Sequence, residues 1–299
     1  MTFADPDIVR MLKNDFIPVA IDQWYERKQQ DAKGEFYRKI ASQGPRYDFS
    51  ATTQGRYVCT PDGKLLGYNN NRGSERLKVV LQQALQDFDL RTESGVTAKA
   101  STPLDSRYDL QPPEDGVTLR TFTKVLNGYQ YADDQWQKAF EDSIARDNVW
   151  LEKSDVTEIK KVLEIGGPFP ERLAQRLARF HFNDNTRGEP NRWNKTELKM
   201  LQLNLATDGK LTGIFQLENA KGNLGFEGEI LGEIRFESED LIRFDMVAKG
   251  MFWGHGWFAP HPPKGKFPVA IAFTLADGTD VADRLIPHGA KGNIDEYLK

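Results

Sequence analysis

Histidines, carboxylates and one arginine in the second half of the chain are the residues best suited to chemistry. All four histidines come after residue 180. The candidate catalytic residues are His181, Asp184, Arg187 and His255. Imidazole and carboxylate groups bind divalent metal ions, and the candidate metal ligands are His181, His255, His261 and Glu189. A metal ion would lower the pKa of bound water for attack on an ester or lactone, and Arg187 would stabilise the oxyanion.

The spacing of these residues matches no HExxH, HxHxDH or EF-hand pattern, so a non-catalytic interpretation stays open. In that interpretation His181 ends a helix and interacts with its dipole, while His255 and His261 are exposed loop residues. The sequence has neither a GxSxG elbow for a serine hydrolase nor a phosphate-binding loop. Two function classes remain: a metal-dependent hydrolase and a non-catalytic binding protein.

The segment 251–268 (MFWGHGWFAPHPPKGKFP) combines aromatic residues with glycine and proline. Functional residues are often held on loops of this kind by a sheet. The aromatic side chains are consistent with the wall of a ligand pocket, with hot spots of an interface, or with a plug that fills the end of a barrel. In the first case the pocket residues would be Trp253, Trp257 and Phe258.

Cys59 is the one cysteine of the chain. A single cysteine excludes an intramolecular disulfide, a CxxC redox pair and a multi-cysteine zinc site. Its position in RYVCT, on the apolar side of an expected strand, favours a small buried hydrophobe over a catalytic thiol.

The amino-acid composition limits the classes of partner that the protein is expected to bind. A net charge of -4 and a pI of about 5.7 give no reason to expect nucleic acid or an anionic membrane. No apolar run approaches the ~18 residues of a membrane span, and the N-terminus lacks the pattern of a signal peptide. We therefore expect a cytoplasmic protein, or an exported one if the native N-terminus is longer. The partner would be a small molecule or a protein, and the oligomeric state is left open.

The elements that must position the candidate site lie in residues 117–299. A strand is expected at 117–126, and helices are expected at 134–145, 156–163 and 170–182. Alternating apolar runs then predict strands at 201–206, 210–218, 225–236, 241–249 and 269–275. Short turns between them indicate an α+β domain with a curved antiparallel sheet or partial barrel.

The first 90 residues have a different pattern. Asp5 and Pro6 begin a helix, residues 16–21 (FIPVAI) form an apolar run typical of a buried strand, and residues 25–42 read as a polar helix. TTQGRYVCTPDGKLLG predicts a hairpin around Pro61-Asp62-Gly63, and an amphipathic helix capped by Ser74 follows. Residues 91–116, poor in apolar side chains and rich in proline, predict a linker.

FADPDIVRMLKNDFIPVAID and TTQGRYVCTPDGKLLG resemble the segments that follow the redox motif in bacterial thioredoxin-like domains. The resemblance covers about 85 residues and implies an incomplete thioredoxin-like α/β domain in residues 1–90. Two departures stand out: the CxxC motif and first strand are missing, and Thr53-Gln54-Gly55 replaces the expected cis-proline. Dithiol oxidoreductase activity is therefore excluded. We expect another strand to fill the gap or the neighbouring strands to close over it, because unpaired buried backbone groups cost about 1–3 kcal/mol each.

Overall fold

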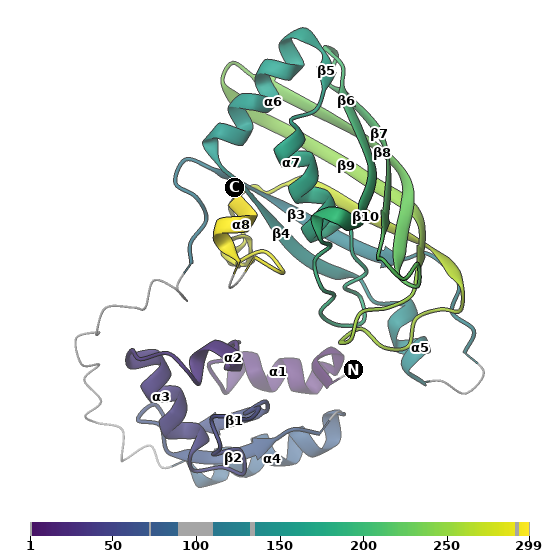
Figure 1. Ribbon diagram of the computed structural model, residues 1–299. Helices are drawn as coiled ribbons and strands as arrows, with labels where there is room; N and C mark the ends of the chain where they lie inside the picture. Colours follow the sequence, from purple (N-terminus) through teal and green to yellow (C-terminus); the bar gives the residue numbers. More distant parts are fainter. Residues whose placement is uncertain (1, 72, 89–109, 132–134, 291–292, 299) are drawn as a thin grey trace. The chain divides into compact units, whose positions relative to one another are not determined.

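The computed structural model describes residues 2–71, 73–88, 110–131, 135–290 and 293–298 (Figure 1). The chain forms two compact units, Met1–Leu110 (unit 1) and Gln111–Lys299 (unit 2). The boundary falls inside the predicted linker 91–116, of which residues 91–109 lie outside the described part. No helix of the described residues is long and apolar enough to cross a membrane.

Unit 1 packs helices against a two-stranded hairpin. Its elements are η1 (Thr2–Ala4), α1 (Pro6–Asn14), α2 (Gln23–Glu26), α3 (Ala32–Ala41), β1 (Arg56–Cys59), β2 (Leu65–Asn69) and α4 (Ser74–Asp87). Asp5 caps α1 as predicted, because its carboxylate accepts hydrogen bonds from the backbone N–H groups of Asp7 and Ile8. The hairpin turn uses Gly63 at φ +86°, a conformation that favours glycine. Ser74 is the first residue of α4 rather than its cap, which is Gly73.

The core of unit 1 is small. Ile8 and Met11 of α1 meet Leu77 and Leu81 of α4 and Val58 of β1. Below about 100 residues, a core of this size leaves little margin of stability. The expected helix at 25–42 divides into α2 and α3, because Asp31 begins a new helix by accepting a hydrogen bond from the Gly34 N–H.

The apolar run at 16–21 corrects one prediction. It is not a strand, and its side chains are not buried: Ile17 is 92% exposed and Val19 is 75% exposed. Among the described residues β1 pairs only with β2, so no further strand fills or closes the expected gap.

Unit 2 is built around one open sheet of eight antiparallel strands in the order β4-β3-β10-β9-β8-β7-β6-β5. The strands are β3 (Val117–Val125), β4 (Ala145–Leu151), β5 (Gly167–Pro168), β6 (Leu198–Leu205), β7 (Lys210–Glu218), β8 (Gly225–Glu237), β9 (Asp240–Trp253) and β10 (Lys266–Leu275). Its helices are α5 (Gln135–Glu141), α6 (Lys153–Ile165), α7 (Glu171–Arg176), the π-helical turn η3 (Leu177–His181), η4 (Lys195–Glu197), η5 (Val281–Arg284) and α8 (Ile294–Leu298). The predicted antiparallel sheet is confirmed, but the sheet does not close into a barrel.

Helices α6 and α7 cover the inner face of this sheet (Figure 1). Buried aromatic rings run across that face from Phe182 through Phe215, Phe226 and Phe252 to Phe267, with successive ring centroids 4.7–5.6 Å apart. Edge-to-face and tilted contacts at this spacing favour dense packing. The inner face of the sheet is therefore filled by side chains of the protein itself.

A pair of glycines allows the two longest strands to approach closely. Gly228 of β8 lies directly opposite Gly250 of β9. A Cβ atom on either residue would collide with the backbone of the neighbouring strand. Glycine in a strand interior often marks a site where another backbone approaches closely, as these two residues do.

Residues 277–283, which follow β10, contact the strands β3 and β4 through ion pairs between aspartates and arginines. Asp283 accepts hydrogen bonds from Arg120 Nε at 2.8 Å and from an Arg146 guanidinium N–H at 2.8 Å. Asp277 bonds Arg120 and Asp280 bonds Arg146. The Arg120 hydrogen bond holds the pKa of Asp283 below its usual range, and hydrogen bonds from Thr279 lower that of Asp277 to about 2.

This network predicts acid sensitivity. A carboxylate with a lowered pKa in the folded state adds stability above its unfolded pKa of about 3.9, and loses it as pH falls toward the folded value. We expect the free energy of unfolding to fall between about pH 4 and pH 2, and Asp283→Asn to reduce that slope. Urea unfolding over this pH range measures both. Equal slopes in the wild type and the variant would contradict the assignment.

Candidate functional site

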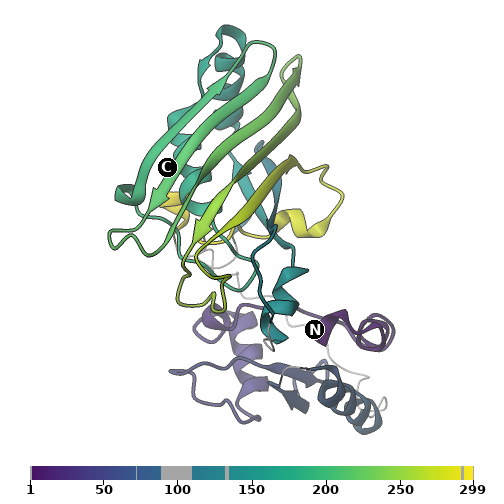
Figure 2. The ribbon, with the colours of Figure 1, turned by 90° about the vertical axis from the view of Figure 1, so that its right-hand side faces the viewer.

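The loop between β9 and β10, residues 254–265, is the most distinctive surface feature of unit 2 and lies at one end of the sheet (Figure 2). It is held by one buried arginine. Arg187 donates from its terminal nitrogen Nη1 to the carbonyl oxygens of Ala259 and, at 3.1 Å, Pro260. A guanidinium group has donors on several sides, so a single side chain can fix both the loop and its own counter-ion.

That counter-ion is Asp184. Its Oδ2 accepts from Arg187 Nε at 3.0 Å and from Arg187 Nη2 at 2.7 Å, while its Oδ1 accepts from the N–H of Thr186. The side chains of Asp184 and Arg187 are almost completely buried. Both charges are therefore paired and hydrogen-bonded, which is the condition for holding ions in a protein interior.

Backbone contacts seat the loop as well. Glu189 and Phe258 form an isolated antiparallel bridge. Gly188 lies so close to the carbonyl oxygen of Phe258 that any Cβ atom there would collide with it. Glycine permits this approach because it has no side chain. Residues 182–189 and the segment 251–268 therefore meet through the bridge between Glu189 and Phe258 and through the hydrogen bonds from Arg187 to backbone carbonyl oxygens, not through histidines.

The anchored loop presents aromatic rings to solvent. Trp257 is 84% exposed and Phe258 is 63% exposed, whereas Phe252, at the end of β9, is 3% exposed. Of the aromatic residues in 251–268, Phe252 and Phe267 belong to the core, and Trp257 and Phe258 do not plug the sheet. Large exposed apolar patches are common at interaction sites, and these two rings are adjacent on one loop.

A hollow of about 630 Å³, open to solvent, lies beside this loop. Its lining consists of Glu218, Gly222, Asn223, Trp253, Gly254, Pro262, Pro263, Lys264, Gly265 and Lys266. The Trp253 indole donates to the carbonyl oxygen of Gly222 at 3.1 Å, and the Lys266 ammonium lies 4.2 Å from its ring centroid. Of the three predicted pocket residues only Trp253 lines this hollow, since Trp257 and Phe258 lie outside its lining.

His181 belongs to a separate, buried network. Its Nδ1 lies 3.1 Å from Oδ2 of Asp147, and its Nε2 lies 2.9 Å from the hydroxyl of Tyr297 in α8. The other Asp147 oxygen, Oδ1, accepts from the backbone N–H of His288 at 2.8 Å. Burial opposes ionisation of Asp147, but the hydrogen bonds from His181 and His288 outweigh it and lower the pKa of Asp147. The hydrogen bonds among Asp147, His181 and Tyr297 connect β4, η3 and α8.

Asp147, His181 and Tyr297 are connected in the way that the residues of a proton relay are. His181 and Tyr297 are buried, however, so a substrate cannot reach them. Tyr297 is 1% exposed, and burial raises its pKa, so the hydroxyl stays protonated and can donate to His181. A general base must reach the proton that it abstracts from a bound substrate. The arrangement is suited to fastening the C-terminal helix.

The four predicted metal ligands have separate environments in the structure. Both ring nitrogens of His181 already have partners, and His255 is exposed with its Nδ1 at 2.9 Å from the carbonyl oxygen of Gly256. His261 is exposed and adopts φ +60°, and Glu189 is placed by its bridge to Phe258. In the part of the chain that the structure describes, no three His, Cys, Asp or Glu side chains gather to hold a metal ion.

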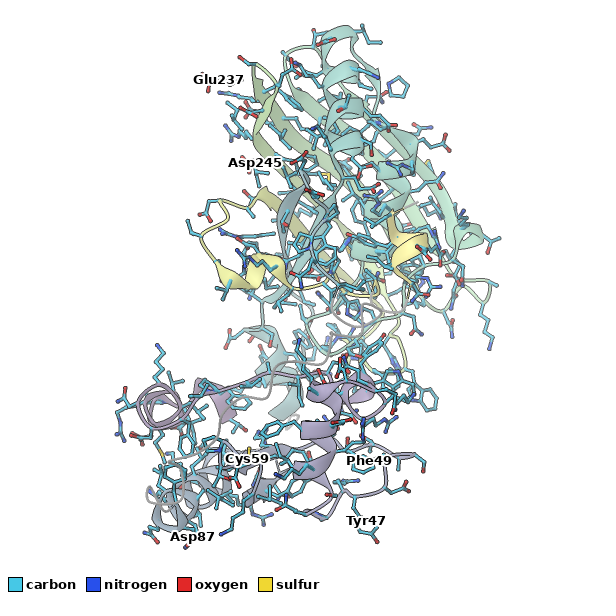
Figure 3. The ribbon with its side chains drawn as sticks, turned by 90° about the vertical axis from the view of Figure 1, so that its left-hand side faces the viewer. Tyr47, Phe49, Cys59, Asp87, Glu237 and Asp245 are labelled. Carbon is cyan, nitrogen blue, oxygen red and sulfur yellow. The ribbon has the colours of Figure 1, made fainter. Side chains whose placement is uncertain are left out.

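Cys59 is half-buried inside unit 1, away from the rim where Tyr47 and Phe49 lie (Figure 3). Burial, with the nearby Asp62 carboxylate, raises the pKa of its thiol. A thiol that resists ionisation is a poor nucleophile. These properties agree with a packing role at the end of β1.

No protein-family model, curated protein sequence or solved structure matches this chain.

Proposed function

We propose that unit 2 is a non-catalytic binding module whose anchored loop captures a protein partner through Trp257 and Phe258. The observation that carries the proposal is that two exposed aromatic residues are held on a loop fixed by a buried ion pair. Aromatic residues dominate the binding energy of protein interfaces, and a rigid backbone reduces the entropy lost on binding.

The energetics of the anchor support a role in positioning. A buried ion pair gains little net stability over apolar side chains of equal volume, because both ions lose their hydration. Exposed aromatic rings also forgo the ~25 cal/mol per Å² that burial would provide. The buried ion pair and the exposed rings both sacrifice stability at the same loop. This combination is better explained by a role in binding a partner than by a role in stabilising the fold.

The shape of the surface favours a protein over a small molecule. Small ligands usually bind in concave sites that bury most of their surface. The hollow beside the loop is open to solvent, and the aromatic core fills the inner face of the sheet. The exposed rings of Trp257 and Phe258, next to an open hollow, suit a protein partner whose own surface is concave. No feature of the described residues favours the metal-dependent hydrolase.

For unit 1 we propose a thioredoxin-like scaffold without redox chemistry. Its support is the element order α1, α3, the β1–β2 hairpin with its Pro61-Asp62-Gly63 turn, and α4. A single half-buried thiol with a raised pKa agrees with the absence of dithiol activity.

Site-specific photo-crosslinking tests the binding function. A benzoylphenylalanine at position 258 should crosslink one recurrent protein in the cells that naturally produce this chain. The matched control carries the same group at Leu231, which is also exposed but lies on the outer face of the sheet. Identical products from both positions, or none from position 258, would refute the proposed loop interface.

A further inference from the structure

Residues 16–21 of unit 1, which lie between Asp15 and Asp22, form an apolar segment. Among the described residues, no hydrogen bond reaches the main chain of residues 16–21. Ile17, Val19 and Ile21 are exposed, and no charged residue lies between Asp15 and Asp22. An unpaired, uncharged apolar stretch is a ready template for strand addition, and natural proteins rarely leave one uncovered.

Both ends of the segment are fixed. The Gln23 side chain accepts from the backbone N–H of Thr53 at 3.0 Å, and Phe16 packs against the core that contains Val58. The chain between these points is thus presented by the fold at a defined place. Fixed ends lower the entropy lost when a partner strand pairs with it.

We propose that this segment pairs antiparallel with the same segment of a second copy of the chain, with Val19 on the two-fold axis. In that register Ile17 of one copy lies opposite Ile21 of the other, so isoleucine faces isoleucine. The contact is isologous, because both copies contribute the same residues. Cross-strand pairs of β-branched residues stabilise antiparallel ribbons.

Proline supports this register. Antiparallel strands alternate hydrogen-bonded and non-hydrogen-bonded pairs, so bonding at Val19 also places Ile17 and Ile21 in bonding positions. Pro18 then falls in a non-bonded position, where its missing N–H is not required. A register shifted by one residue on one strand would place Pro18 at a bonding position or lose the two-fold symmetry.

The charges are compatible with a second copy. Asp15 lies opposite Gln23, and Asp22 lies opposite Phe16, so no carboxylate faces a carboxylate. Like charges directly opposite each other destabilise strand pairs. The carboxylates flank the apolar contact at both ends and limit the addition of further strands, which favours a closed dimer over a fibre.

Sedimentation velocity of the full chain over a wide concentration range tests the proposal. We expect a reversible monomer–dimer equilibrium, weakened about tenfold or more in Val19→Lys, which places two ammonium groups together on the axis. Two controls should retain the dimer: Pro18→Ala, and Val79→Lys at an exposed position of α4. A monomer at every concentration, or a dimer unaffected by Val19→Lys, would overturn the proposal.

A third control separates this contact from the loop of unit 2. Trp257→Ala with Phe258→Ala should leave the dimer intact, because the two contacts use different residues. A dimer that is lost in that variant and kept in Val19→Lys would reject pairing through residues 15–23, and it would assign self-association to the aromatic loop.

Discussion

Replacing Arg187 with methionine is expected to lower the free energy of unfolding of unit 2 by about 3–5 kcal/mol. The methionine side chain fills much of the volume but leaves the Asp184 carboxylate buried without its cation. The carbonyl oxygens of Ala259 and Pro260 lose their donor as well. Breaking a buried pair from one side is costly because an uncompensated charge remains.

Urea unfolding of the full chain measures this effect. Fluorescence reports mainly on unit 2, because five of the six tryptophans, all but Trp24, follow residue 110. Asp184→Asn combined with Arg187→Met should be more stable than Arg187→Met alone, since no buried charge is left unpaired. Arg235→Met, in a partly exposed pair with Glu233, should change stability by less than about 0.5 kcal/mol. A loss no larger in Arg187→Met than in Arg235→Met would show that the anchor contributes little.

Asp155→Ala is the second replacement with a large expected effect, a loss of about 3–5 kcal/mol. Asp155 is fully buried near the start of α6 and bonds Arg176 of α7 at 2.6 Å and Arg172 at 2.6 Å. It also accepts from the Glu152 N–H, completing the cap of α6. Among the described residues, the variant leaves the buried Arg176 cation with the carbonyl oxygens of Trp150 and Leu298 and the ring of Tyr297 as its contacts.

The same helix supplies a matched control. Lys160 of α6 pairs with Glu239, whose side chain is almost fully exposed, so Glu239→Ala should be nearly neutral. Asp155→Leu combined with Arg176→Met should recover part of the loss, because both charges are removed together. Thermal unfolding followed by near-ultraviolet circular dichroism of the buried Trp150 and Trp193 measures each variant. Equal stability of Asp155→Ala and Glu239→Ala would contradict the assigned role.

Sequence periodicity predicted most of the sheet in unit 2. The strands β7 and β10 largely alternate buried apolar residues with more exposed ones, and this period of two is visible locally. β4 was missed: residues 147–151 are nearly all buried and do not alternate, and residues 134–145 read as helix. Local pattern also could not reveal that residues 16–21 lack a partner strand, because pairing depends on distant chain segments.

The candidate site was predicted only in part. Glycine and aromatic residues marked the loop at 251–268, and Arg187 and Asp184 were singled out, but for chemistry rather than as an anchor. His181 was assigned to the wrong partners, because Asp147 and Tyr297 lie 34 and 116 residues away in the chain. Neither has a motif around it, so only the folded chain brings the three together.

Calorimetric titration tests the binding function most directly, when the partner identified by crosslinking is titrated into the wild type and into Trp257→Ala. We expect the variant to bind at least about 30-fold more weakly, which is the loss of about 2 kcal/mol expected of a hot-spot residue, and the stability of unit 2 to be unchanged. Equal affinity of the two proteins would show that the exposed loop is not the binding surface.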